Sequence, residues 1–433
     1  MINTREIVLD CIIEILEKKQ YSHQVIKQVL DKYAYLDKRE RSFIKRTVEG
    51  TIERCIELDY VLNLYSKVPV SKMKPVIRSI LRMGVYQLLY MDGVPDSAVC
   101  NESVKLAAKR GFVNLKGFVN GVLRSVAKKK KEIPYPVREG NITAYLSITY
   151  SMRPWIVERW LASYGEAQTE EILAELLSER PLTIRIREDL APAKKQELLE
   201  EMNRAGMEAE QTKELPYAYH IKGADRVESI PGFKEGKCFV QDAGSMAIIE
   251  AAEIKTGQTI IDVCAAPGGK ALHAAEKLQN TGMVTARDVS EHKVLLMEEN
   301  IKRSGLTNIR AQIQDALVLQ EEEIEKADLV IADLPCSGLG VIGRKGDIKY
   351  RIEPADIEKI AGLQRRILSV VWQYVKPGGK LLYSTCTLTE EENHENTAWL
   401  CENFPFQLIK ERTFLPGKDG TDGFYLAVLT KIS

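Results

Sequence analysis

The sequence is poor in the features that mark secreted, membrane-spanning and metal-binding proteins. Its eight cysteines and five histidines are scattered over 433 residues, and no two cysteines have CxxC spacing. This distribution fits neither a disulfide framework nor a zinc site, so we expect free thiols and no metal. No apolar run approaches the roughly 20 residues that span a bilayer, and the start MINTREIVLD lacks a signal peptide's basic-then-apolar order. We therefore expect a cytoplasmic protein with no membrane partner.

The chain also lacks an excess of charge of either sign. It has 61 basic and 61 acidic side chains, so the usual basic signature of a nucleic-acid partner is missing. The average hides an asymmetry, because residues 101–131 contain nine Lys or Arg against one Glu, a local excess of 9 − 1 = +8, whereas residues 321–328 are strongly acidic. A solvated helix face explains such a basic run more often than RNA binding does.

Length and periodicity indicate several domains. A chain of 433 residues with 45% hydrophobic content is too long for one ordinary core. Apolar residues recur at helical spacing from Ile7 to about Ala127, which predicts an all-helical domain over residues 1–130. A lysine run, two prolines and a glycine then break the pattern, and we predict a linker over 131–145.

The rest of the chain predicts two more domains. Residues 146–240 mix helices with short β-branched runs, which indicates a small α+β subdomain. From 241 to 433 strands alternate with helical stretches, which predicts a parallel sheet covered on both faces. The expected strands, in chain order, are TIIDV, MVTARD, IRAQI, DLVIAD, KLLYST and FYLAVLTK. The predicted fold class is therefore multidomain: all-α, then a small α+β subdomain, then a doubly wound α/β domain.

A glycine-rich turn marks the candidate ligand site. The segment DVCAAPGGK, residues 262–270, follows a buried strand and opens a helix, where a doubly wound sheet binds its ligand. Gly268 and Gly269 let the backbone approach that ligand closely. The segment is not GxGxxG and lacks a GK[ST] ending, so dinucleotides and nucleoside triphosphates are disfavoured as ligands.

Four aspartates follow successive predicted strands: Asp262, Asp288, Asp315 and Asp333. Because parallel strands end at the same edge of a sheet, we expect these side chains to converge on one crevice. An acid ending the second strand can accept both hydroxyls of a ribose, and one after the third can accept from an adenine amino group. Each alone is more often a helix cap or turn residue, but four in register favour an adenosine-type ligand.

Two cysteines differ from the others in their surroundings, Cys336 in DLPCSG and Cys386 in LLYSTCT, because both directly follow predicted strands. The C5 atom of cytosine is too weak a nucleophile to attack a sulfonium methyl group. Adding a thiolate to C6 makes C5 enamine-like, after which a base must remove the C5 proton. Cys386, Cys336 and the carboxyl group of Asp333 could supply this chemistry. The alternative is that both are buried structural thiols, and the residues alone do not decide which thiol attacks.

In this order and spacing, DVCAAPGGK, DLPCSG and LLYSTCT resemble the signature of RNA cytosine-5 methyltransferases. The resemblance implies that Cys386 is the nucleophile and that Cys336 assists product release, as the base or through it. The S-adenosylmethionine site that it implies consists of Cys264, Ala265, Ala266, Pro267, Gly268, Gly269, Lys270, Asp288, Asp315 and Asp333.

The predicted helical domain over residues 1–130 indicates which group of these methyltransferases the chain resembles. LRMGVYQLLY, VPDSAVCNESVKLAAKRG and KGFVNGVLRSV resemble the RNA-binding fold of the NusB antitermination factor. The combination is similar to the RsmB/Sun family of bacterial 16S ribosomal RNA cytosine-5 methyltransferases, which implies a Rossmann-like catalytic domain and 16S rRNA as partner. We infer no obligate protein partner. The chain departs from the family at Tyr350, where Trp is common and where tyrosine keeps an aromatic surface.

Our first hypothesis is methyl transfer to C5 of a cytosine in 16S rRNA through a Cys386 adduct. The alternatives are the same chemistry on tRNA or another RNA, and a noncatalytic RNA-binding or antitermination protein, which the first 130 residues suggest when taken alone. A nucleotide-dependent oxidoreductase is disfavoured because its glycine fingerprint is missing.

Overall fold

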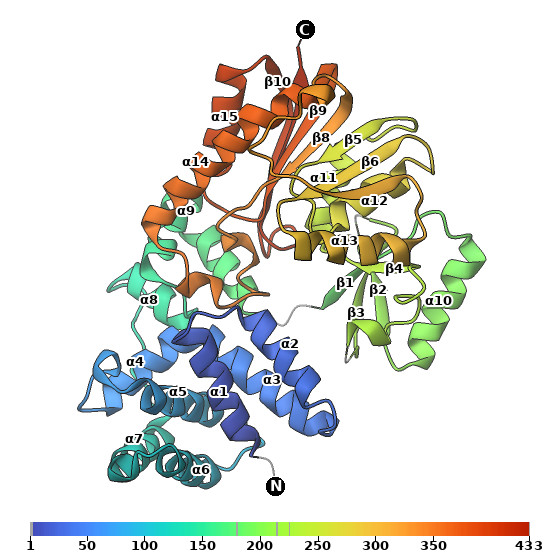
Figure 1. Ribbon diagram of the computed structural model, residues 1–433. Helices are drawn as coiled ribbons and strands as arrows, with labels where there is room; N and C mark the ends of the chain where they lie inside the picture. Colours follow the sequence, from blue (N-terminus) through green and yellow to red (C-terminus); the bar gives the residue numbers. More distant parts are fainter. Residues whose placement is uncertain (1–2, 179–180, 214, 225, 433) are drawn as a thin grey trace. The chain divides into compact units, whose positions relative to one another are not determined.

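The chain forms two compact units. The computed structural model describes residues 3–178, 181–213, 215–224 and 226–432 (Figure 1). The first unit consists of the residues up to Leu177 together with Ile342–Glu353. The second unit consists of Ser178–Val341 and the residues from Pro354 onward. The predicted domain limits at 130, 145 and 240 stay predictions.

The first unit is helical throughout its described residues. Its α-helices are α1 (Thr4–Leu16), α2 (Ser22–Lys32), α3 (Lys38–Glu53), α4 (Cys55–Tyr65), α5 (Pro75–Tyr90), α6 (Asp96–Lys109), α7 (Lys116–Lys129), α8 (Ile142–Thr149) and α9 (Pro154–Leu176). Side chains at helical spacing, such as Val8 with Ile12 and Val119 with Leu123, are fully buried in one apolar cluster. The prediction of an all-helical N-terminal part is confirmed.

Local sequence explains where several of these helices begin. The side chain of Asn3 accepts hydrogen bonds from the first backbone N–H groups of α1, and Asn141 does the same for α8. Pro75 and Pro154 stand at the first positions of α5 and α9, where the missing N–H of proline costs no helical hydrogen bond.

The second unit starts with a small antiparallel sheet in the order β2-β3-β1-β4. Its strands are β1 (Leu182–Ile186), β2 (Glu208–Gln211), β3 (Ala218–Lys222) and β4 (Cys238–Val240). Helix α10 (Pro192–Arg204) buries Leu198 and Met202 against Ile184 and Ile186 of this sheet. The expected α+β middle part is therefore present.

A seven-stranded sheet forms the rest of the second unit, in the order β10-β11-β9-β8-β5-β6-β7. Its strands are β5 (Thr259–Asp262), β6 (Met283–Asp288), β7 (Ile309–Ile313), β8 (Ala327–Asp333), β9 (Val375–Thr385), β10 (Phe406–Phe414) and β11 (Phe424–Lys431). Strands β5 to β9 run parallel, and β10 and β11 are antiparallel. All six predicted strands are present. We did not predict β10, an edge strand whose central residues are exposed and lack an apolar pattern.

Helices cover both faces of the large sheet (Figure 1). They are α11 (Ala243–Ala251), α12 (Gly269–Lys277), α13 (Glu291–Ser304), α14 (Pro354–Val371) and α15 (His394–Asn403). Ile260 packs with α11, α12 and α13, whereas its neighbour Ile261 packs with α14 and α15, because successive strand residues point to opposite faces.

The order of the strands places a switch point between β5 and β8. The chain runs from β5 outward to β7, and then returns to β8 on the other side of β5. In sheets of this kind the ligand binds outside the carboxyl ends of the strands at that point. The residues that end β5 and β8 are Asp262 and Asp333.

Candidate active site

A buried carboxyl group lies at the switch point. Asp262 ends β5 with no exposed surface, and neither of its carboxyl oxygens has a hydrogen-bond partner among the described residues. Burial and, to a smaller extent, the nearby charge of Asp333 raise the pKa of Asp262 to about 8. An unpartnered buried carboxyl group is costly, and a cationic or hydrogen-bond-donating ligand would compensate that cost.

The predicted glycine-rich turn joins β5 to α12 beside Asp262. Gly268 has φ +101°, a left-handed conformation that strains other residues, and its N–H donates to the carbonyl of Ala265 at 2.7 Å. Helix α12 begins at Gly269, so its first backbone N–H groups lie at the edge where the sheet binds its ligand. Within the turn Ala265 is buried, Cys264 and Ala266 are half-buried, and Pro267 is exposed.

Lys270 pairs with Asp333, the acid that ends β8. Its Nζ lies 2.8 Å from Asp333 Oδ2, and the hydroxyl of Ser384 donates to Oδ1 at 2.7 Å. Burial lowers the pKa of Lys270, but Asp333 and, to a smaller extent, Cys386 more than offset this effect, so the pKa stands above its usual range. Lys270 is therefore a charged partner of an aspartate.

The two singled-out cysteines meet at this edge of the sheet. Cys336 Sγ and Cys386 Sγ lie 2.9 Å apart, and the backbone N–H of Cys386 donates to Cys336 Sγ at 3.2 Å. Both residues are half-buried free thiols. The hydrogen bond with Cys386, together with burial, raises the pKa of Cys336 well above its usual range. Cys336 is therefore held in its protonated form.

Glu392 and Asn393 hold the loops that carry the thiols. The fully buried Glu392 accepts a hydrogen bond from the backbone N–H of Ser337, next to Cys336, at 2.8 Å. Asn393 accepts from the hydroxyl of Thr385 at 2.6 Å and donates to the carbonyl of Thr387 at 3.1 Å. We did not predict either residue, because the run TEEENHEN reads as a solvated acidic helix start.

Asp288 and Asp315 differ in their surroundings. Asp288 ends β6, is almost fully buried and contributes to the pKa of Asp262. Its register partner on β7 is Ile313, which is exposed, as is Val289. Asp315 lies beyond the end of β7, is exposed, and accepts from the backbone N–H of Leu317 at 2.9 Å. The structure thus brings Asp262, Asp288 and Asp333 together, whereas Asp315 caps its own loop.

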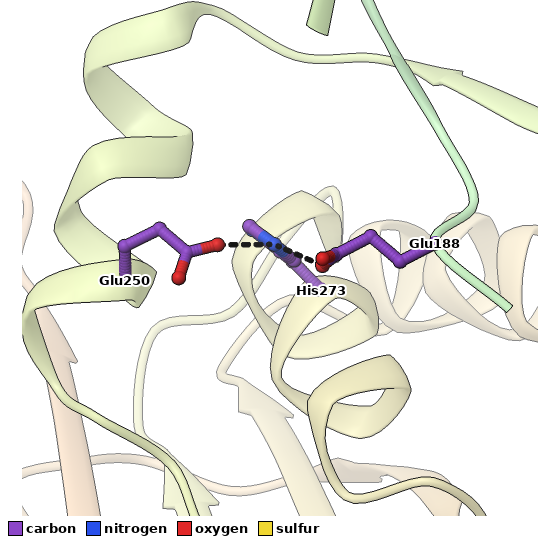
Figure 2. A group of neighbouring side chains, drawn as sticks. All are labelled: Glu188, Glu250 and His273. Carbon is purple, nitrogen blue, oxygen red and sulfur yellow. Dashed lines mark ion pairs between the residues drawn. The ribbon is translucent and has the colours of Figure 1, made fainter. Parts of the chain in front are cut away.

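A second cluster of titratable groups joins the small sheet to α11 and α12. Figure 2 shows the ring of His273 between the carboxylates of Glu188 and Glu250, with its Nε2 at 3.9 and 3.7 Å from their oxygens. Lys277 Nζ lies 2.6 Å from an oxygen of each glutamate. Burial lowers the pKa of His273 to about 3, so the ring is neutral. The ammonium group of Lys277 occupies the place that a bound cation would take between the two carboxylates. The cluster is therefore a salt bridge of one lysine with two glutamates.

The fold and site define the class of Rossmann-like, S-adenosylmethionine-dependent methyltransferases. The family model for 16S rRNA methyltransferase RsmB/F matches residues 250–430, the NusB family model matches 2–128, and the ferredoxin-like domain model of RsmF/B-like methyltransferases matches 154–228.

Curated relatives place the chain within that class. It is 35% identical to the probable ribosomal RNA small subunit methyltransferase B of Bacillus subtilis, over 99% of each protein. It is 30% identical to the protein of that name from Synechocystis, over 100% of each. The chain therefore belongs to the RsmB/F family of methyltransferases, and the predicted family resemblance is confirmed.

Solved structures agree with this assignment. The crystal structure of PH0851 aligns with a TM-score of 0.82 at 25% identity and covers 100% of this chain and 99% of that one. A methyltransferase homologue from Pyrococcus horikoshii aligns with a TM-score of 0.60 at 25% identity, over 68% of this chain and 100% of its own. The fold is thus a NusB-like helical domain, a ferredoxin-like domain and a Rossmann-like methyltransferase domain.

Proposed function

We propose that the protein transfers a methyl group from S-adenosylmethionine to C5 of a cytosine in 16S rRNA, through a bond between Cys386 Sγ and C6 of the ring. The observation that carries this proposal is the pair of thiols 2.9 Å apart, next to the Lys270–Asp333 ion pair at the switch point. The small-subunit rRNA in the names of the relatives supports the substrate class.

The residues at the switch point fit S-adenosylmethionine. The unpartnered carboxyl group of Asp262 suits a cationic group of the cofactor, and Asp288 can accept the ribose hydroxyls. The exposed side chains of Val289 and Ile313 beside Asp288 offer apolar surface to the adenine ring, and Asp315 can accept from its amino group. The turn from Cys264 to Lys270 completes the site. When bound, the cofactor supplies an electrophilic methyl group on its sulfonium sulfur.

The surroundings of the two thiols favour Cys386 as the nucleophile. Cys336 keeps its proton, and its S–H can donate to the sulfur of an ionised Cys386. The electrostatic interaction that raises the pKa of Lys270 also stabilises negative charge on Cys386. The site therefore supports one thiolate and one thiol, and only a thiolate adds readily to C6.

The chain's own groups account for the remaining steps. As Cys386 Sγ bonds to C6, the ring electrons move toward C5, which takes the methyl group. Asp333 can accept from the cytosine amino group, because each carboxylate oxygen accepts more than one hydrogen bond. Adduct formation removes the negative charge of Cys386 that kept Cys336 protonated, so Cys336 can release its proton to solvent and, as a thiolate, take up the C5 proton. Loss of that proton returns the electron pair to the ring and releases Cys386.

One helix of the first unit is proposed to bind RNA phosphates. Part of the basic excess over 101–131 is neutralised within the protein, since Lys109 pairs with Glu6 and Lys130 with Asp96. In contrast, five exposed cations in or just after α7 have no ion pair among the described residues: Lys116, Arg124, Lys128, Lys129 and Lys131. Exposed cations without ion pairs can replace the counterions of phosphates.

The test is methyl transfer from radiolabelled S-adenosylmethionine to protein-free 16S rRNA, followed by nucleoside analysis. Wild type and a Cys401→Ala control, which alters a half-buried thiol in α15, should yield 5-methylcytidine, whereas Cys386→Ala should yield none. Label on tRNA alone would contradict the rRNA assignment and keep the chemistry. If no RNA is labelled, the noncatalytic RNA-binding hypothesis replaces the proposal.

A further inference from the structure

A segment between the two active-site cysteines belongs to the first unit. The chain leaves the second unit after Val341, contributes Ile342–Glu353 to the first unit, and returns to the second unit at Pro354. We call Ile342–Glu353 the bridging segment. It begins a few residues after Cys336, so the chain that carries this thiol continues directly into it.

Two charged side chains anchor the bridging segment in the first unit. Lys349 is 1% exposed and donates its ammonium group to the carbonyls of Glu53 at 2.7 Å and Ser151 at 2.6 Å. Asp347 is 3% exposed and accepts hydrogen bonds from the backbone N–H, at 3.3 Å, and the hydroxyl of Ser22, the first residue of α2. A cation thus meets a helix C-terminus and an anion a helix N-terminus, the arrangement that the helix dipole favours.

Two further side chains extend this contact. The hydroxyl of Tyr350 donates to the carbonyl of Ile52 at 2.9 Å, and its ring packs against the apolar cluster of the first unit. Arg351 donates to the carbonyl of Lys19 at 2.6 Å and stacks over the ring of Tyr21. The aromatic surface that we expected Tyr350 to offer is thus used in packing. Together these hydrogen bonds, of which those of Asp347 and Lys349 are buried or partly buried, specify one position of the segment.

The chain before the bridging segment is tied to the nucleophile. The N–H of Gly340 donates to the carbonyl of Cys386 at 3.0 Å, and its own carbonyl accepts from the N–H of Gly423 at 2.8 Å. A Cβ atom at Gly340 would lie 2.1 Å from the carbonyl oxygen of Gly423, so only glycine allows this approach. Cys336, Gly340 and the bridging segment therefore lie on one short run of chain, which is hydrogen-bonded at Gly340 to the backbone of Cys386.

We propose that the alignment of the two thiols depends on the hydrogen bonds that hold the bridging segment in the first unit, with Lys349 as a positioning residue. The proposal deepens the proposed function and rests on it for the identity of the reaction. When the bridging segment is held in this way, it fixes the position of Gly340. Gly340 in turn fixes the backbone of Cys386 through their hydrogen bond, so that the two sulfur atoms lie close together. The first unit then supports catalysis as well as RNA binding.

The test compares Lys349→Met, which keeps a long apolar stem but removes the ammonium group, with Lys345→Met, which alters an exposed lysine of the same segment. Because small misplacements of reacting groups are costly, we expect Lys349→Met to lower the single-turnover rate about tenfold or more. The KM for RNA and the affinity for S-adenosylmethionine should change less than the rate. Lys345→Met should behave as wild type.

A second readout does not depend on the RNA reaction. Alkylation of Cys386 by iodoacetamide in the free full-length protein, followed by peptide mass spectrometry, reports the surroundings of the thiol directly. We expect the alkylation rate to change in Lys349→Met and to stay at the wild-type value in Lys345→Met. If wild type methylates no RNA, the proposed function fails, whereas this readout still tests the bridging segment.

Folding defects are distinguished by a milder variant. Tyr350→Phe removes only the hydroxyl that donates to the carbonyl of Ile52 and should shift both readouts in the same direction as Lys349→Met, by a smaller factor. A lower melting temperature with unchanged alkylation and unchanged single-turnover rate in both variants would overturn the proposal. The segment would then stabilise the first unit without positioning the thiols.

Discussion

At the scale of single residues, the roles that we propose for Cys336 and Cys386 follow from one shared proton. Two ionised sulfur atoms 2.9 Å apart would repel strongly, so the pair ionises once. The raised pKa of Cys336 assigns the proton to that residue, and the positive charge of Lys270 lies near the other sulfur. Neither fact is visible in the order of the residues, since both cysteines follow a strand and stand among small polar neighbours.

This assignment predicts opposite outcomes for the two cysteine variants. Cys336→Ala should accumulate a covalent protein–RNA complex, because attack by Cys386 continues while release of the product is impaired. Cys386→Ala should form no complex, since no thiolate reaches C6. Denaturing gel electrophoresis with radiolabelled rRNA measures the complex. The double variant is the control and should give none, whereas a complex in Cys386→Ala alone would reverse the two roles.

At the scale of secondary-structure elements, the Glu188–Lys277–Glu250 ion pair and His273 join the small sheet to α11 and α12. Burial keeps His273 neutral, with a pKa of about 3 against 6.5 for an ordinary histidine. The folded state therefore binds fewer protons than the unfolded state between these two values. The contribution of His273 to the free energy of unfolding consequently falls as the pH drops from 6.5 toward 3, by up to about 1.4 kcal/mol per pH unit.

The prediction is an acid-sensitive stability that depends on His273. Between pH 7.5 and pH 5 the contribution of His273 should lower the urea midpoint of the wild type, and His273→Leu should lack this contribution, whereas the opposite contribution of the buried Asp262 is the same in both proteins. Circular dichroism at the two pH values measures the difference. A His292→Leu variant, which changes an exposed histidine in α13, is the control and should keep the wild-type fall. Equal falls in all three proteins would contradict the role assigned to burial.

At the scale of the whole molecule, an RNA enzyme with net charge +0 is consistent with a local basic surface. Internal ion pairs neutralise part of the basic run, and the cations in and after α7 keep their charge available. Salt dependence of RNA binding should therefore come from a few positions, although the average composition gives no sign of them.

The variant Lys128→Gln with Lys131→Gln tests this distribution of charge. It should weaken binding of rRNA and lower the slope of log Kd against log salt concentration by about one per lysine lost. Lys105→Gln is the control, because Lys105 already pairs with Glu102 at 2.7 Å and should change the slope less. Filter binding at several salt concentrations measures both. Equal slopes for wild type and the double variant would remove α7 from the RNA surface.

Much of the fold could be predicted because its signals are local. Helical spacing of apolar residues marks the first unit, and strands such as TIIDV are continuous apolar runs because parallel strands are buried on both faces. Strand β10 was missed because an edge strand needs no such pattern. The limits of the two units were harder to predict. Residues 342–353 belong to the first unit although the residues on both sides of them belong to the second, and no local sequence signal marks this change.

By itself, the sequence determined the class of the fold, the family and the short motifs at which chemistry was expected, because these depend on residue type and spacing along the chain. Only the tertiary structure decided that Asp262, Asp288 and Asp333 share one edge, that Lys270 pairs with Asp333, and that Cys336 keeps the proton next to Cys386. It also revealed that Glu392 binds the backbone next to Cys336 and that Lys349 is buried against the carbonyl of Glu53. Burial and distances of a few ångströms set these properties, and both arise only when segments far apart in the chain meet.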